Sequence, residues 1–160
     1  YGGFYSDLDL VLEREIDALC ECQAVFPLEW EMSEEVFVDR HKREPDHARE
    51  LWQLGNYAFG ATAGHPFLLA IVEEMISRTQ FLEPKIVSDS DVLFTTGPDL
   101  ISDVYYERYP DFENCVTILE GTPSEETPSQ NIPRDPRWYR FGEFGTHLLD
   151  GSWKHPASGA

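Results

Sequence analysis

The sequence predicts an α/β domain built on a mixed sheet flanked by helices. Segments rich in aliphatic and aromatic residues with strand-like spacing alternate with segments of helical periodicity, which is the pattern of this class. The 160 residues suit one domain with one core. The chain is 41% hydrophobic and 13% aromatic, which is typical of a globular protein and not of a disordered one.

The first half of the chain divides at glycines and prolines. Apolar residues with strand-like alternation follow Gly2-Gly3 and predict a strand, while Pro27 interrupts the next apolar run. The stretch 33–54 is charged and ambiguous, although Pro45 suits the first turn of a helix. In chain order we expect a strand over 4–11, a short helical segment over 12–20, a strand over 24–30 and a short helix over 45–54.

The second half contains the clearest helix, which begins at Gly64-His65-Pro66. One apolar stripe at helical spacing is expected to face the core, made of Leu68, Ile71, Val72, Met75 and Ile76. A further helix is expected after Thr95-Thr96-Gly97-Pro98, with Leu100, Ile101, Val104 and Tyr105 on one face. Strands are expected over 56–61 and 116–119. The stretch 121–136 lacks periodicity and reads as a loop insertion, and 154–160 as a loose tail.

The charge balance excludes one class of partner. The formal net charge is −18, and such a surface repels phosphate backbones, so we expect no nucleic-acid binding. The same carboxylates are compatible with capture of a divalent cation, although most of them need do no more than favour solubility. No apolar run reaches the roughly 18 residues of a membrane span. We interpret the chain as a piece of a longer protein, in which membrane association comes only from segments outside it.

Cysteine spacing leaves the redox compartment open. A C-x-C pair, Cys20 and Cys22, and the distant Cys115 match no familiar zinc spacing. One disulfide and three buried thiols are both compatible with the sequence.

Two acidic pairs of the form D-x-D are present, Asp7-Leu8-Asp9 and Asp89-Ser90-Asp91, where the twelve aspartates predict about one by chance. The first pair lies at the end of an expected strand, where residues i and i+2 point to the same side and where ligands collect in α/β sheets. Neighbouring carboxylates stay ionised more easily around a cation, and Mg²⁺ and Mn²⁺ prefer their oxygens. The second pair lies in a polar stretch without such a platform. Asp7 and Asp9 are therefore the candidate metal ligands.

Four segments in order resemble one glycosyltransferase family. They are Tyr1-Gly2-Gly3-Phe4-Tyr5-Ser6-Asp7-Leu8-Asp9, Asn56 through Ala63-Gly64-His65-Pro66-Phe67, Thr95-Thr96-Gly97-Pro98, and His147 followed by Gly151-Ser152-Trp153. The chain resembles the glycosyltransferases with a DxD-containing sugar-binding region, which include initiating mannosyltransferases of the fungal Golgi, inositol phosphoceramide mannosyltransferases and capsular polysaccharide transferases. Phe4 departs mildly from the usual aliphatic residue. On this basis, 1–153 is the DxD-containing, C-terminal portion of a catalytic domain.

The resemblance implies a GT-A type fold whose N-terminal part is missing here. It implies a retaining transfer of a hexose from a nucleotide sugar, GDP-mannose first and UDP-sugars next, to a glycan or glycolipid acceptor, with Mn²⁺ or Mg²⁺ as cofactor. It places Asp7, Asp9 and His147 at the metal. The donor-binding residues that it suggests are Tyr5, Asp7, Asn56, Ser152 and Trp153. No residue clearly serves as a catalytic nucleophile.

Two other functional classes remain alternatives. One is a noncatalytic carbohydrate- or cation-binding fragment that lacks the complete nucleotide pocket. The other is a two-carboxylate glycoside hydrolase, which we rank low because its acid and base must flank a sugar cleft, whereas one D-x-D places both carboxylates on one side. The compartment stays open between the Golgi lumen of a eukaryote and the cytoplasm or inner membrane face of a bacterium.

Overall fold

The computed structural model describes residues 1–80, 88–121 and 137–149 and confirms a mixed α/β architecture. Its strands are β1 (Gly2–Ser6), β2 (Leu10–Leu12), β3 (Ala24–Glu31), β4 (Trp52–Leu54), β5 (Ala58–Thr62), β6 (Val116–Leu119), β7 (Arg140–Phe141) and β8 (Gly145–His147). Its helices are α1 (Glu34–His41), α2 (Pro66–Thr79), α3 (Asp89–Thr95), α4 (Pro98–Glu107) and α5 (Tyr109–Phe112), with 3-10 segments η1 (Asp17–Glu21) and η2 (Ala48–Leu51).

The larger sheet is mixed and is centred on β3. Strands β1 and β5 pair antiparallel, and β5 continues antiparallel onto the first residues of β3. Strand β4 pairs antiparallel with the second half of β3, and β6 runs parallel to β3 with Ala24 opposite Val116. A smaller antiparallel sheet has the order β2-β8-β7. The mixed sheet that the sequence predicts is therefore present.

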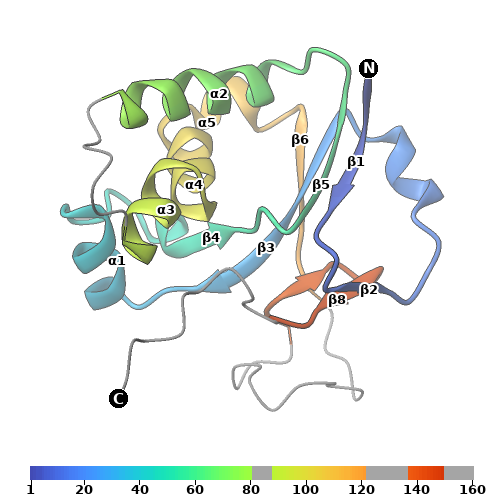
Figure 1. Cartoon of the computed structure of the whole chain (residues 1–160), viewed down its shortest axis with the longest axis horizontal. Coiled ribbons are helices and arrows are strands. Elements are labelled where there is room, and N and C mark those ends of the chain that lie inside the picture. Colours follow the sequence, from blue (N-terminus) through green and yellow to red (C-terminus); the bar gives the residue numbers. More distant parts are fainter. Residues whose placement is uncertain (81–87, 122–136, 150–160) are drawn as a thin grey trace.

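Side-chain alternation along β3 separates two cores. Phe26 packs in the core formed with α2 and α4, whereas Val25 packs with Leu19 and Tyr57 in a second core. Figure 1 shows the helices on one side of β3, β5 and β6, with the η1 segment on the other. A row of stacked and edge-on rings crosses the helical face, because Phe59 stacks on Phe26 at 5.2 Å and Phe26 meets the edge of Phe67 at 5.2 Å.

Strand β1 is an edge of the larger sheet, and all five of its residues are exposed. Its sequence, Gly-Gly-Phe-Tyr-Ser, contains no charge and no proline. Natural edge strands usually contain lysine, proline or a bulge that discourages pairing with another chain. The described part of this edge has none of these within the strand.

Helix α2 forms where the sequence predicts it, but its buried face is different. Ile71 is buried, at 6% exposed, whereas Ile76 is 61% exposed. Phe67 and Ala70 are buried as well. The buried face therefore begins at Phe67, one residue before the expected Leu68. Arg78 lies on the same side of α2 and pairs with Asp103 of α4 at 3.0 Å. The expectation that Val72 and Ile76 are core residues is wrong.

Other elements agree with the sequence to different degrees. Strands β3, β5 and β6 lie within a residue or two of expectation, and α4 buries the expected Leu100, Ile101, Val104 and Tyr105. The expected helical segment over 12–20 is only the 3-10 segment η1, because Leu12 belongs to β2. The ambiguous stretch contains helix α1, capped by Ser33, and the helix expected over 45–54 shrinks to η2 before β4 begins.

Buried ion pairs fix α4 against α1 and β4. Asp99 is 2% exposed and receives two hydrogen-bonding contacts from the Arg40 guanidinium, at 2.6 and 3.0 Å. Gln53 donates to the same carboxylate. Burial raises the pKa of Asp99, and the Arg40 charge opposes that shift. Some of the abundant carboxylates are therefore structural rather than solvating.

The remaining expectations concern thiols, membranes and the unplaced ends. Cys20, Cys22 and Cys115 are free thiols, with Cys20 exposed and the other two partly buried. Among the described residues, no helix is both long and apolar enough to cross a bilayer. Most of the loop insertion expected over 121–136, and the tail over 154–160, lie outside the described residues.

Two isoleucines of α2 test which face of the helix is buried. Ile71→Ala is expected to lower the free energy of unfolding by about 2–5 kcal/mol, because it leaves a cavity in the core. The same change at Ile76 is expected to alter it by no more than about 0.5 kcal/mol, because that side chain is exposed. Urea denaturation of the two variants measures both values. Equal losses would contradict the orientation of α2.

Candidate metal centre

Asp7 and Asp9 lie in the turn between β1 and β2. Strand β1 ends at Ser6, and β2 begins at Leu10. The turn is closed by a hydrogen bond from the Leu10 amide to the Asp7 carbonyl, at 3.3 Å. The expected strand over 4–11 is wrong in its bounds, because β1 ends at Ser6 and the two aspartates occupy the turn after it rather than same-side positions of one strand. Their proximity therefore comes from the turn.

His147 reaches this turn from the other end of the chain. Strand β8 pairs antiparallel with β2, and His147 is the partner of Leu10. The Leu148 amide donates to the Asp9 carbonyl at 2.9 Å, which extends the contact by one residue. One ligand atom from each of Asp7, Asp9 and His147 lies within 4.8 Å of the others. The three residues that the sequence places at a metal are thus gathered at one point.

The imidazole is oriented toward the acidic pair. His147 Nε2 lies 3.2 Å from Asp9 Oδ2, and the two side chains are 12% and 23% exposed. Burial lowers the pKa of His147, although the charges of Asp9 and Asp7 oppose this shift. The ring is therefore neutral at pH 7, which is the form that binds metal ions. Its Nδ1 is buried and has no hydrogen-bond partner among the described residues.

Tyr5 adds a hydroxyl to the same site from β1. Its OH donates to Asp7 Oδ1 at 2.6 Å, while its half-exposed ring stacks on Phe59 at 5.1 Å. The hydrogen bond to Asp7 raises the pKa of Tyr5, and burial adds to the shift. The hydroxyl consequently stays protonated at neutral pH and orients one carboxylate. Tyr5 is one of the donor-binding residues expected from the sequence, and the structure places it beside the acidic pair.

Tyr57 contacts both the acidic turn and His147, and it was not among the expected site residues. Its carbonyl accepts the Asp7 amide at 2.7 Å, and its ring stacks on His147 with centroids 4.3 Å apart and planes 15° from parallel. The residue is 1% exposed. An aromatic residue at a strand entry looks like any core residue in a sequence. The only available signal was its position next to Asn56, which belongs to a suggested motif.

The small sheet that holds His147 is stabilised by a partly buried ion pair. Arg140 of β7 pairs with Glu13, which follows β2, at 2.9 Å, and Thr146 of β8 bonds to both side chains. Strands β2 and β8 also approach closely at Gly145, where an added Cβ would lie 2.7 Å from the Val11 carbonyl oxygen. These contacts fix the register of β8 on β2 and so the place of His147.

Other residues singled out in the sequence lie elsewhere. His65 caps α2 by accepting the Phe67 amide at 3.3 Å, which is a structural role. Asp91 forms a capping box with Ser88 at the start of α3, so the second acidic pair begins a helix. Asn56 directly precedes Tyr57 in the connection between β4 and β5. The expected donor residues Ser152 and Trp153 lie outside the described residues.

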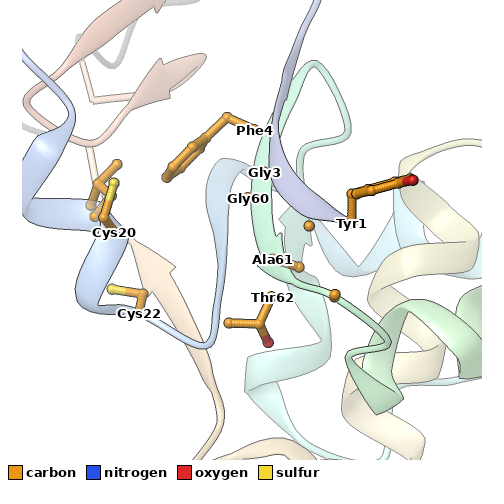
Figure 2. A pocket seen from close by; sticks show the side chains of 11 residues that line it. Tyr1, Gly3, Phe4, Cys20, Cys22, Gly60, Ala61 and Thr62 are labelled. Atoms are coloured by element: carbon orange, nitrogen blue, oxygen red, sulfur yellow. The ribbon is translucent and has the colours of Figure 1, made fainter.

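A shallow cavity of about 290 Å³ lies beside the opposite end of β1 from the acidic pair. Cys20 and Cys22 line it from η1 and the residue after it, and Phe4 lines it from β1, as Figure 2 shows. A second cavity of about 370 Å³ lies at His47 and Tyr109. Neither of these two cavities is lined by Asp7, Asp9 or His147. Within the described residues, the acidic site is a surface cluster and not the floor of either cavity.

The Glu13–Arg140 pair predicts a pH dependence of stability. The hydrogen bond from Arg140 lowers the pKa of Glu13 below its ordinary 4.5. A carboxyl with a lowered pKa stabilises the fold above its unfolded value, and this contribution is lost as the pH falls through the folded value. We therefore expect Glu13→Gln to reduce the loss of stability below about pH 4.5 in urea titrations.

Glu143→Gln is the matched control, because the Arg14–Glu143 pair is largely exposed. An identical acid response of the unsubstituted protein and Glu13→Gln would contradict this role for the Glu13–Arg140 pair.

Comparisons with protein-family models, with curated proteins and with solved structures give no match to this chain. The glycosyltransferase resemblance consequently rests on the four sequence motifs, and the architecture shown is a mixed α/β fold.

Proposed function

We propose that this chain is part of a retaining, divalent-metal-dependent glycosyltransferase, which moves a hexose from a nucleotide sugar to a glycan or glycolipid acceptor through a GT-A type domain. The observation that supports this proposal most is the convergence of Asp7, Asp9 and His147 from opposite ends of the chain. These are the residues that the motif resemblance assigns to the metal, and spacing alone does not bring them together.

The donor set suits a divalent cation. Two carboxylates provide the hard oxygen ligands that Mg²⁺ and Mn²⁺ prefer, whereas an imidazole is a ligand more typical of transition metals. The combination favours Mn²⁺ over Mg²⁺. The ring of His147 fits this role, because its Nε2 lies 3.2 Å from a carboxylate oxygen of Asp9. All three residues are only partly buried, so phosphate oxygens could reach a cation held by them.

The chemistry requires control of negative charge. Departure of a nucleoside diphosphate places charge on a phosphate oxygen, and a bound divalent cation neutralises it as a Lewis acid. Asp7 and Asp9 would hold the cation, and the Tyr5 hydroxyl would keep the Asp7 carboxylate in place. Ser152 and Trp153 are the proposed hydrogen-bond donors to the diphosphate, from the motif alone. We assign no nucleophile.

A noncatalytic cation- or carbohydrate-binding fragment is the second candidate. One observation favours it, because neither of the two described cavities borders the acidic cluster. The same cluster would then bind a cation without a sugar nucleotide. The two candidates share the metal site and differ in nucleotide binding, which makes them separable by one titration.

Calorimetric titration of Mn²⁺ with GDP, and then with UDP, tests both candidates. We expect metal-dependent binding of one of the nucleotides, which Asp9→Asn abolishes because it removes a charged ligand. Asp89→Asn is the matched control, since it makes the same change in the second D-x-D, which is exposed at the start of α3. Circular dichroism establishes that all three proteins are folded.

The outcomes separate the proposals. Binding of Mn²⁺ without either nucleotide would support the noncatalytic candidate. Absence of Mn²⁺ binding at millimolar concentration, or equal binding by Asp9→Asn and the unsubstituted protein, would overturn the transferase proposal and the cation-binding form of the second candidate.

A further inference from the structure

Tyr57 is the one described residue that bonds to the acidic turn through its backbone and stacks on the imidazole through its ring. From this geometry we infer that Tyr57 is a positioning residue of the metal centre, which fixes His147 with Nε2 toward Asp9. The inference rests on the proposed metal site and goes beyond it, because the cluster proposed to hold the cation consists of Asp7, Asp9 and His147.

The backbone contact sets the position of the turn. The Asp7 amide donates to the Tyr57 carbonyl at 2.7 Å, which joins the residue after β1 to the residue before β5. Strand β1 is an exposed edge that pairs with β5 up to Ser6 and Ala58, and this bond extends the contact by one residue into the turn. A displaced turn would carry Asp7 and Asp9 away from His147, since both belong to it.

The ring contact sets the orientation of the imidazole. At 4.3 Å and 15° the two rings lie almost in parallel, so the Tyr57 ring opposes tilting of the His147 ring out of its plane. Ligating histidines commonly gain their orientation from a hydrogen bond on the second ring nitrogen. Here the Nδ1 of His147 has no such partner among the described residues, and the stacked ring takes over that function.

The hydroxyl of Tyr57 is not what holds the ring in place. It is buried and has no hydrogen-bond partner among the described residues. Burial raises its pKa well above the ordinary value, so it stays protonated at neutral pH. The ring position therefore comes from packing in the second core, with Val25, Ala58 and Phe141. Phenylalanine at this position would keep both the stack and the backbone bond.

Substitutions at position 57 separate stacking from mere packing. Tyr57→Phe is expected to bind Mn²⁺ within about twofold of the unsubstituted protein, whereas Tyr57→Leu and Tyr57→Met are expected to bind about 10–100-fold more weakly. Two non-aromatic variants are used so that one unfolded protein does not end the test. Phe112→Leu, in the other core and equally buried, is the matched control for lost stability and should bind like the unsubstituted protein.

A second readout needs no metal. The ring protons of His147 lie over the Tyr57 ring, and their nuclear magnetic resonances in the metal-free protein should be shifted upfield by its ring current. The shift should persist in Tyr57→Phe and in Phe112→Leu and vanish in the Leu and Met variants. If the shift is present but the unsubstituted protein binds no Mn²⁺, the metal proposal fails while the orientation of His147 by Tyr57 stands.

Three results would overturn the inference. They are an unshifted His147 in the unsubstituted protein, a loss of Mn²⁺ affinity in Tyr57→Phe as large as in Tyr57→Leu, and a comparable loss in Phe112→Leu.

Discussion

The short antiparallel ladder between β2 and β8 is the constraint on which the acidic site depends. It pairs only three residues of each strand, from Leu10 with His147 to Leu12 with Gly145. Side-chain direction in such a ladder alternates, so a slip of one residue would turn His147 to the opposite face. The close approach at Gly145 and the Arg140–Glu13 pair prevent that slip. The position of the His147 imidazole therefore depends on contacts made by residues outside the proposed metal cluster.

A site assembled from both ends of a chain depends on everything between them. Bringing residue 147 back to residue 9 carries a chain-entropy cost that the local turn cannot offset by itself. The burial of the two cores around β3 meets that cost, so the cluster exists only in the folded domain. This differs from small metal domains in which the ion itself drives folding. Here the two cores bring Asp7, Asp9 and His147 together.

Local patterns predicted the elements better than their faces. Strands β3 and β6 and helix α4 lie where the spacing of their apolar residues predicts a strand or a helix. Helix α2 is apolar on several sides, so its local spacing does not decide which side is buried, and the partner of Arg78, Asp103 on α4, cannot be identified from the sequence. Asp7 and Asp9 could be singled out from the strand before them. His147 could be found only through the motif resemblance, and Tyr57 not at all, because a stack between distant rings leaves no trace in local spacing.

The uncharged edge at β1 has a consequence for how the molecule behaves in solution. Its backbone groups are open to another strand, and nothing within the strand discourages pairing. Mutual repulsion between molecules of net charge −18 is then what opposes association. That repulsion acts over only about 8 Å at physiological ionic strength and over less in concentrated salt. Whether the molecules stay apart in solution therefore depends on the charge of the whole acidic surface. Because the β1 edge is open to pairing, that outcome also depends on the salt concentration.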